Sequence, residues 1–360
     1  MLPYEDELLF ASLAVQRAVI ATKTVLSSVQ KGILSKSDAT PVSLADFAGQ
    51  ALIVSAIHGA FPEDVIVGEE DASSLRSNPD LAQQVWDLVQ STNLGNEINE
   101  KLMSRPKSLE EMLDFIDLGG TGNPTIRGRC WTIDPVDGTK TFLQGTQYCV
   151  VAALLEDGEE KAAVIGCPHI NLQRSPPIIS ETEDSIDRDG TGCLISAIKG
   201  QGTWVRPLSD STAEQSRQIR IQGAGAPERN LIFTGNQDTR TPQLSTRHII
   251  AERLGATWPP HHIYSTQLGY VACALGTCDV HLKAPKEPPT EHAPYVWDHA
   301  GGILIYEEAG GKVTDLNGMP VVLSAGRKLT RNYGIIAAPE EIHGRALEAA
   351  RVAIDEAIGQ

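Results

Sequence analysis

Residues 130–142 read CWTIDPVDGTKTF, and we take this stretch as the starting point for the fold and the chemistry. Its first four residues predict a buried strand, which ends directly at Asp134. Asp134 and Asp137 lie three residues apart, the carbonyl of Val136 lies between them, and Gly138 permits an unusual backbone angle. An ordinary Asp/Pro/Gly turn would explain this segment taken alone. The neighbouring motifs favour a functional site instead.

Further acidic residues stand at the expected ends of other elements. Glu69 and Glu70 follow the short β-branched run at 65–67, Asp46 lies in the first turn of a predicted helix, and Asp298 is expected to cap a later one. A solvated strand end or an N-cap would explain each of them separately. Hard divalent cations such as Mg²⁺ prefer carboxylate and carbonyl oxygens, and several carboxylates converge only where a cation offsets their repulsion. The set as a whole therefore indicates a metal site.

The hydrophobic pattern changes along the chain. Its spacing predicts helices at 5–30, 43–57, 79–90 and 107–117, then strands at 147–155, 161–166, 193–198 and 203–205. After a Gly/Pro-rich segment at 222–227, strands and helices alternate, with strands at 231–233 and near 262–264, and helices at 267–275, 297–309 and 339–357. Polar loops are expected at 35–41 and 173–192. We therefore expect an N-terminal α+β domain over residues 1–222 and a C-terminal α/β domain over residues 223–360.

Composition limits the classes of function. The 360 residues carry 30 Lys and Arg against 46 Asp and Glu, a formal net charge of −16, which argues against a nucleic-acid groove reader or a binder of anionic membranes. The first residues lack the basic-then-apolar order of a signal peptide, and no uncharged apolar run reaches about 18 residues. We therefore expect a cytoplasmic protein. The 6 cysteines lack zinc spacing, and we interpret them as reduced, mostly buried residues.

Taken together, these motifs resemble the lithium-sensitive, magnesium-dependent phosphatase superfamily that includes inositol monophosphatase and fructose-1,6-bisphosphatase. The hallmarks are an acidic pair after a strand, the Asp-Pro-Val-Asp-Gly-Thr turn and a late Trp-Asp helix start, in this order along nearly the whole chain. Four parts of the chain are similar to the fungal type of 3'(2'),5'-bisphosphate nucleotidase: 37–46, 137–143, 165–168, and 297–300 with 308–311. The resemblance implies a layered αβαβα sandwich of α/β class with the site between its two domains.

The resemblance also implies an activity. Members of that family remove the 3'-phosphate from adenosine 3',5'-bisphosphate (PAP), giving AMP and phosphate, and can act on the sulfated analogue PAPS. The implied cofactor is two or three Mg²⁺ ions. The implied metal ligands are Glu69, Asp134, the Val136 carbonyl, Asp137 and Asp298. Asp46 and Thr139 would form a catalytic dyad that orients the attacking water, and Glu70 would support the site.

The predicted substrate pocket departs from the family pattern. Asn236 stands where a His is usual, Gly269 replaces the Lys of a Ser-x-x-Lys motif, and Gln144 replaces a basic residue. Thr266 keeps the hydroxyl of that motif, and Lys283 occupies a later basic position. The residues expected to contact substrate are Thr139, Asn236, Thr266, Lys283 and Asp298. The metal-binding motifs are thus complete, whereas the nucleotide-binding motifs are altered.

Two alternatives remain open. The same chemistry on another small phosphomonoester, such as an inositol phosphate, is motivated by Asn236 and Gly269. A non-catalytic, nucleotide-binding paralogue is the second alternative, and the complete acidic set argues against it. The expected partner is a small-molecule phosphomonoester, with no nucleic-acid polymer and no membrane. Nucleotidases of this type are often monomeric.

Overall fold

The computed structural model describes residues 3–27, 33–35, 41–124, 127–143, 145–173, 192–208, 216–221, 231–235, 243–283 and 293–358. The expected domain boundary at 222–227 and most of the expected loop at 173–192 lie outside these ranges, as do Gln144 and Asn236. The division into two domains stays a prediction.

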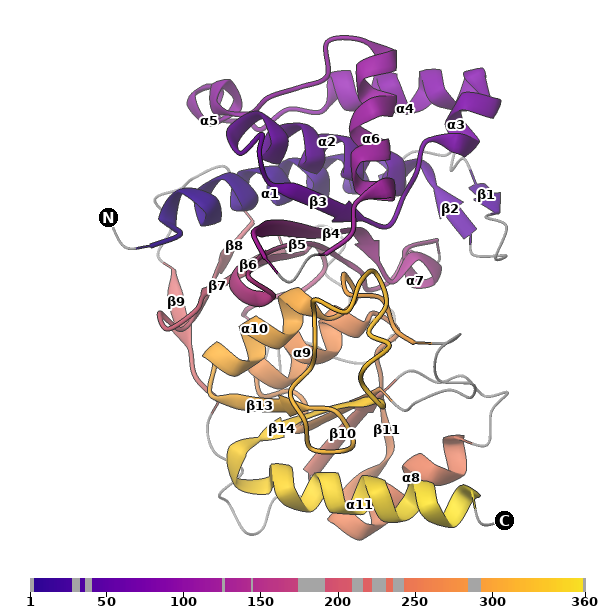
Figure 1. The fold of residues 1–360 in the computed structure, drawn as a ribbon, viewed down its shortest axis with the longest axis vertical. Helices are drawn as coiled ribbons and strands as arrows, with labels where there is room; N and C mark the ends of the chain where they lie inside the picture. Colours follow the sequence, from indigo (N-terminus) through magenta and orange to yellow (C-terminus); the bar gives the residue numbers. More distant parts are fainter. Residues whose placement is uncertain are drawn as a thin grey trace.

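Five layers alternate between helices and sheets, which confirms the αβαβα sandwich (Figure 1). The outer helical layer contains α1 (Glu5–Ser27), α2 (Leu44–Ala60), α4 (Pro79–Ser91) and α6 (Leu109–Thr121). The central helices are α9 (Thr266–Ala274) and α10 (Ala300–Glu308), and the last layer contains α8 (Gln243–Leu254) and α11 (Glu340–Ile358). A sheet lies between each pair of helical layers, because both faces of each sheet are apolar and must be covered.

The first sheet has seven strands in the order β3-β4-β5-β6-β7-β8-β9. They are β3 (Val65–Gly68), β4 (Arg129–Asp137), β5 (Cys149–Glu156), β6 (Glu159–Cys167), β7 (Cys193–Ile198), β8 (Thr203–Pro207) and β9 (Arg217–Ile219). Only β3 and β4 pair in parallel, with Gly68 opposite Ile133, and the other pairs in this sheet are antiparallel. Parallel pairing brings the carboxyl ends of both strands to one edge, so the residues that follow Gly68 and Ile133 lie at the same edge.

The second sheet has five strands in the order β11-β10-β12-β14-β13. They are β10 (Leu231–Gly235), β11 (Ala256–His262), β12 (Val280–Lys283), β13 (Gly311–Thr314) and β14 (Ile335–Pro339). The expected strand near 262–264 was misplaced, because the strand occupies Ala256–His262 and pairs in parallel with β10. Two prolines in this segment, Pro259 and Pro260, lowered its strand signal, and its position at the edge of the sheet tolerates them.

The hydrophobic pattern did not predict several short elements. They are β1 (Ile33–Ser35), β2 (Pro41–Ser43), α3 (Ser73–Ser77), α5 (Glu97–Leu102) and α7 (Thr139–Leu143). β1 and β2 form an antiparallel pair, so the expected loop at 35–41 begins and ends in strands. Elements of three to six residues are too short to show a helical or strand period.

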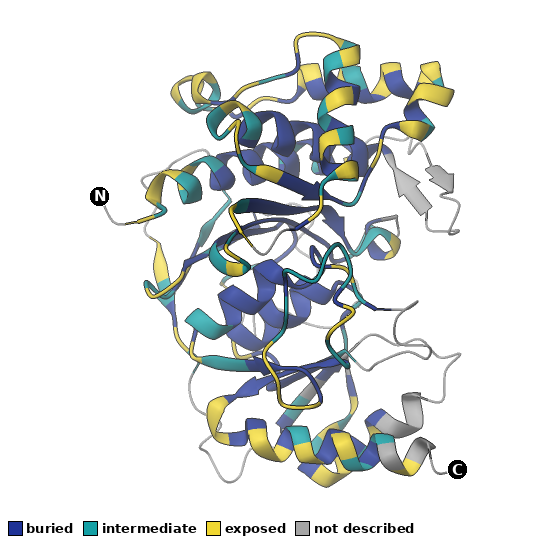
Figure 2. Cartoon of the chain, in the orientation of Figure 1, coloured by how far each residue is buried: buried dark blue, intermediate teal, exposed yellow. Residues whose placement is uncertain are grey.

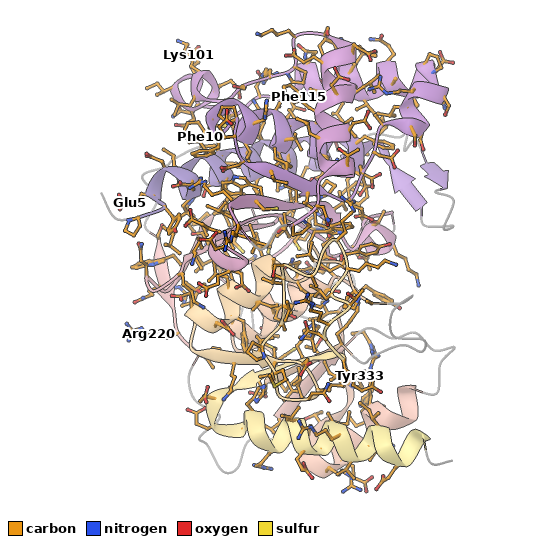
Figure 3. The ribbon with its side chains drawn as sticks, viewed as in Figure 1. Glu5, Phe10, Lys101, Phe115, Arg220 and Tyr333 are labelled. Carbon is orange, nitrogen blue, oxygen red and sulfur yellow. The ribbon has the colours of Figure 1, made fainter. Side chains whose placement is uncertain are left out.

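Buried side chains lie between the layers, and exposed ones cover the outer faces (Figure 2). Phe10 and Phe115 pack against the core under the outer helices, whereas Tyr333 packs near the second sheet (Figure 3). By length and hydropathy alone, α1 could cross a membrane, although 61% of that apolar stretch is buried inside the fold. Arg17 interrupts the stretch, and its guanidinium is fully buried and donates to the carbonyls of Leu52 and Ser104.

Candidate active site

The end of β4 forms a tight turn, and hydrogen bonds within the turn pair its polar groups. The amide of Val136 donates to Asp134 Oδ1 at 3.1 Å, and the Thr139 hydroxyl donates to the Val136 carbonyl at 3.2 Å. Gly138 has a φ of 99°, and a Cβ there would lie 2.9 Å from Thr141 Oγ1. This confirms the unusual backbone angle expected at the glycine, because a side chain at this φ would be strained.

Asp137 connects this turn to the amino end of α9. Its carboxylate accepts hydrogen bonds from the Ser265 hydroxyl at 2.6 Å and the Gln267 amide at 2.6 Å, with the Thr266 amide at 3.3 Å. Ser265 is also the N-cap of α9, since its Oγ accepts from the Leu268 amide at 3.0 Å. The positive end of the helix dipole and these donors stabilise the ionised carboxylate. A residue from the first sheet is thereby fixed to a helix about 130 residues further along the chain.

The charges of four other predicted site carboxylates raise the pKa of Asp134. Burial raises the pKa of Asp134 well above its usual range, and the negative charges of Asp137, Glu69, Asp298 and Asp46 raise it further. Asp134 and Asp46 are each 1% exposed. The structure therefore brings together acidic residues from α2, the end of β3, the end of β4 and the segment before α10.

The pKa of Asp298 shows the same balance of charges. The pKa of Asp298 is raised to about 7: burial and the charges of Asp137 and Glu69 raise it, and the charge of Lys283 partly counteracts them. Burial likewise raises the pKa of Asp137, although the Ser265 hydroxyl, the Gln267 amide and the Lys283 ammonium counteract this rise. Lys283 is thus the nearby cation that partly offsets the cluster of carboxylates.

Gln50 of α2 fixes the backbone at the end of β3. Its Oε1 accepts from the Glu70 amide at 2.9 Å, and its Nε2 donates to the Glu70 carbonyl at 2.6 Å and the Ile116 carbonyl at 2.8 Å. Glu70 is 2% exposed, whereas Glu69 is half-buried. The amide of Gln50 therefore sets the direction in which the acidic pair leaves the strand.

The late Trp-Asp motif differs from the expected helix start. The helix begins at Ala300 and its N-cap is His299, so Asp298 is not the cap. Asp298 instead lies in the preceding turn, where Gln267 Nε2 donates to the Trp297 carbonyl at 2.6 Å. The Asp298 carboxylate is hydrogen-bonded to the backbone of Tyr295, and it acts electrostatically on the acidic cluster.

The expected substrate wall is present in part. Lys283 Nζ donates to Thr266 Oγ1 at 3.3 Å, which joins two residues predicted to contact substrate. The space beside Gly269 is filled: a Cβ there would lie 2.4 Å from Cε1 of His281. His281 is 3% exposed, and neither of its ring nitrogens has a hydrogen-bond partner among the residues that the structure describes. Gly269, which stands where the family usually has Lys, therefore leaves space that the His281 imidazole of β12 fills.

Comparison with known proteins identifies the family. The model of the inositol monophosphatase family matches residues 6–355. The chain belongs to this family. It is 40% identical to a 3'(2'),5'-bisphosphate nucleotidase of Emericella nidulans, with 97% of this chain and 98% of the relative covered, and 36% identical to one of Schizosaccharomyces pombe, with 96% and 95% covered.

Solved structures show the same inositol monophosphatase fold. The IMPase of Thermotoga maritima superimposes with a TM-score of 0.62 at 18% identity, and covers 98% of this chain and 99% of its own. A structure of SaIMPase-II with 2'AMP bound superimposes with a TM-score of 0.55 at 17% identity, and covers 96% of each chain. At these identities the likeness establishes the fold.

The inositol monophosphatase family is metal-dependent, and the donor set of this chain fits a hard cation. The donors are carboxylates and one carbonyl, which Mg²⁺ prefers, and their mutual charges raise the pKa of Asp134, which a divalent cation would offset. Within the described ranges, no group of three or more His, Cys, Asp or Glu side chains is already arranged around one ion position. The fit therefore rests on the chemistry and electrostatics of the donors.

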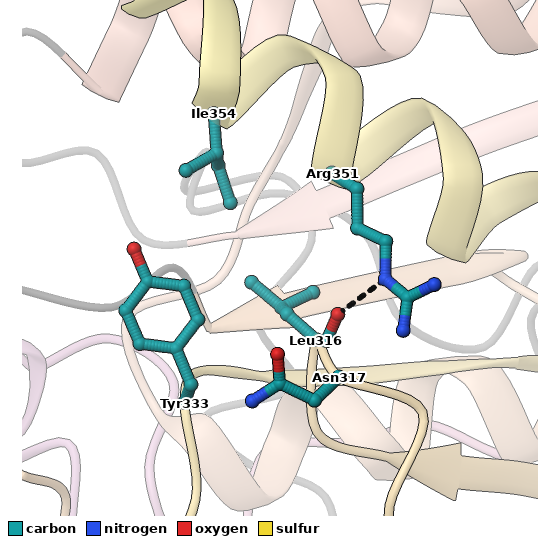
Figure 4. Close-up of a pocket in the computed structure, with 5 residues that line it drawn as sticks. All are labelled: Leu316, Asn317, Tyr333, Arg351 and Ile354. Carbon is teal, nitrogen blue, oxygen red and sulfur yellow. Dashed lines mark hydrogen bonds between the residues drawn. The ribbon is translucent and has the colours of Figure 1, made fainter. Parts of the chain in front are cut away.

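A separate hollow lies between the second sheet and α11 (Figure 4). Leu316, Asn317, Tyr333, Arg351 and Ile354 line it, and Arg351 Nε donates to the Leu316 carbonyl at 2.7 Å. None of these residues belongs to the acidic cluster, so this hollow is not the site that the family motifs indicate.

Sequence reasoning missed three residues that hold the site: Ser265, Gln267 and Gln50. Ser265 precedes an apolar helical run, which is the usual signal for an N-cap, but a cap signal does not reveal a contact with Asp137. Gln50 lies in the middle of an apolar helix and is fully buried, where an unpaired amide would be costly. A polar residue in the middle of an apolar helix could therefore have indicated that Gln50 makes a buried hydrogen bond.

Proposed function

We propose that this protein is a Mg²⁺-dependent phosphomonoesterase that converts adenosine 3',5'-bisphosphate to AMP and phosphate. The observation that carries the proposal is the set of five acidic residues, Asp46, Glu69, Asp134, Asp137 and Asp298: they come from four separate segments of the chain, and the charges of the other four act on Asp134. The full-length similarity to 3'(2'),5'-bisphosphate nucleotidases supports the choice of substrate. The 2'AMP bound to SaIMPase-II supports a nucleotide phosphate on this fold.

Two or three Mg²⁺ ions would be held by Glu69, Asp134, the Val136 carbonyl, Asp137 and Asp298. When bound, such ions neutralise phosphate charge, make water more acidic and stabilise the leaving oxygen. Among these donors, Asp137 is already held in place by its hydrogen bonds to the amino end of α9. The protein would thus supply oxygen ligands from the ends of β3 and β4 and from the turn before α10.

The remaining residues orient the reactants. The Thr139 hydroxyl donates to the Val136 carbonyl, so the proposed water-orienting hydroxyl lies directly beside a proposed metal ligand. In the proposed dyad, Asp46 takes a proton through Thr139, and the attacking water is oriented by the hydroxyl. Glu70 supports the site from a buried position. Phosphoryl transfer depends mainly on such positioning and on charge neutralisation.

Lys283 and Thr266 form the proposed contact surface for the substrate. Lys283 is positive, lies within reach of the Thr266 hydroxyl and acts electrostatically on Asp137 and Asp298. A phosphate held near the acidic cluster would therefore lie next to a cation. Asn236 is proposed to contribute to the same surface and lies outside the described residues.

Phosphate release tests the proposal. Adenosine 3',5'-bisphosphate and inositol 1-phosphate are compared as substrates, with Mg²⁺, with excess EDTA and with added Li⁺, using wild type and Asp134→Asn. We expect Mg²⁺-dependent release of phosphate from the nucleotide, stopped by EDTA and by the substitution. Faster turnover of inositol 1-phosphate would redirect the substrate assignment, and no turnover of either compound with Mg²⁺ would favour a non-catalytic binding protein.

A further inference from the structure

Arg327 joins the ends of two elements, α6 and β3, next to the acidic cluster. Its Nη1 donates to the carbonyls of Gly119 and Gly122, both at 3.0 Å, and its Nη2 donates to the carbonyl of Gly68 at 2.7 Å. The first two carbonyls end α6, and the third ends β3. One guanidinium from the C-terminal half of the chain therefore satisfies three backbone acceptors of the N-terminal half.

The same guanidinium lies over an aromatic ring. Its carbon is 4.6 Å from the ring centre of Trp297, a cation–π distance. Trp297 is 3% exposed and stacks on Tyr295, with 4.6 Å between ring centres and 13° between planes. The backbone reinforces this contact, because the Val296 amide donates to the Arg327 carbonyl at 2.9 Å. Arg327 is therefore fixed to the segment before α10 by its side chain and by its main chain.

The residues that Arg327 contacts immediately precede two of the acidic residues. Gly68 is followed by Glu69, and Trp297 is followed by Asp298. Glu69 leaves the first sheet, whereas Asp298 belongs to the turn before α10, so the two are separated by more than 200 residues of chain. The hydrogen bond to the Gly68 carbonyl and the stacking on Trp297 link these two segments through one guanidinium.

We propose that Arg327 is a positioning residue that holds Glu69 and Asp298 in the relative placement required to share metal ions. This inference rests on the proposed function, because it takes both carboxylates as metal ligands. A lysine at this position would keep the charge but lacks the planar set of five donors that reaches three carbonyls at once. Residues that support metal ligands in this way commonly change metal affinity about 10- to 100-fold when substituted.

Metal affinity, measured without any substrate, tests the inference. Wild type, Arg327→Lys and Arg327→Met are titrated with Mg²⁺ by calorimetry and with Mn²⁺ by electron paramagnetic resonance, and thermal unfolding is recorded in EDTA. Lys328→Gln is the matched control, because Lys328 is the next residue and its Nζ lies 5.1 Å from the ring centre of Tyr295. We expect the dissociation constant to rise about tenfold for Arg327→Lys and further for Arg327→Met, with little change for Lys328→Gln.

The outcomes separate this inference from the proposed function. If wild type binds neither ion, the proposed metal-dependent function fails. If wild type and folded Arg327→Lys bind the ions equally well, the positioning role is wrong. A lower unfolding temperature of Arg327→Lys would then show only that Arg327 stabilises the fold. A kinetic measurement completes the test. In Arg327→Lys, the Mg²⁺ concentration needed for half-maximal phosphate release should increase by a larger factor than kcat at saturating Mg²⁺ decreases.

Discussion

The imidazole of His281 occupies the space next to the α-carbon of Gly269. A Cβ at residue 269 would lie 2.4 Å from Cε1 and 2.5 Å from Nδ1 of His281, closer than atoms can approach without displacement. Burial and the positive charges of Lys283 and Arg247 together lower the pKa of His281 to about 3, so the ring is neutral at physiological pH. Gly269 and His281 therefore form a complementary pair in the wall of the proposed pocket.

Gly269→Ala is expected to destabilise the protein. The added methyl group must displace the His281 ring, and overpacking of this kind costs about 1–3 kcal/mol, more than the roughly 0.5–1 kcal/mol that alanine gains over glycine in a helix. Urea unfolding of Gly269→Ala, His281→Ala and the double variant measures the coupling between the two positions. Gly344→Ala is the control, because Gly344 lies exposed in α11 with open space around it and should be stabilised. Additive effects of the two substitutions would contradict the steric interpretation.

Ser265→Ala is expected to affect stability and metal dependence together. The hydroxyl donates to Asp137 and caps α9, so its loss should cost about 1 kcal/mol of unfolding free energy and raise the Mg²⁺ concentration needed for half-maximal activity. Ser108→Ala is the control, since Ser108 caps α6 by accepting from the Glu111 amide. That variant should lose similar stability with an unchanged Mg²⁺ requirement. Equal Mg²⁺ requirements in both variants would show that Ser265 acts only as a cap.

Asp134→Asn is expected to stabilise the metal-free protein while removing its activity. The amide keeps an oxygen for the Val136 amide but carries no charge, which removes the cost of burying a carboxylate and relieves the repulsion by the surrounding carboxylates. Loss of a metal-binding charge should lower kcat/KM about a hundredfold or more. Thermal unfolding in EDTA and phosphate release with Mg²⁺ check both effects. A lower unfolding temperature for the metal-free variant would be inconsistent with mutual repulsion at Asp134.

Glu160→Gln is expected to change how stability depends on pH. Burial raises the pKa of Glu160 to about 7, and the charge of Glu307 raises it while Lys199 lowers it. Since the folded pKa exceeds the unfolded value of about 4.3, the protonated form stabilises the fold at acid pH, and this contribution is lost as the pH rises towards about 7. The variant should therefore gain on the order of 1–2 kcal/mol over wild type at pH 8 and little at pH 4.

Glu159→Gln provides the matched control for this pH dependence. Hydrogen bonding to Lys161 lowers the pKa of the neighbouring Glu159, and this side chain is exposed. Its substitution should therefore not increase stability at alkaline pH. Urea unfolding of both variants across pH 4–8 measures the difference, and a gain for Glu159→Gln equal to that for Glu160→Gln would refute the assignment to Glu160.

Local sequence was sufficient for the turn after β4 and for most long elements. Gly138 and Asp134 shape the turn within a few residues, and long apolar periods predicted α1, α2 and α11. Short elements such as α7 and the edge strand β11 were missed or misplaced, because they contain too few periods or carry prolines. The cap assigned to Asp298 was wrong, since capping depends on where the helix begins, which local composition does not fix to one residue.

The sequence by itself determined which acidic residues stand at the ends of elements, the order of the motifs and the local turn around Asp134 and Gly138. Tertiary structure decided that Ser265 and Gln267 hold Asp137, that His281 fills the space beside Gly269, and that Arg327 joins Gly68 to Trp297. The physical reason is the distance along the chain. The residues of these pairs lie from 12 to more than 200 positions apart and on different elements, so their contacts depend on strand pairing and on the packing of layers, and neither leaves a local sequence signal. The sequence had singled out Gly269 as a departure from the family pattern, without indicating its contact with His281.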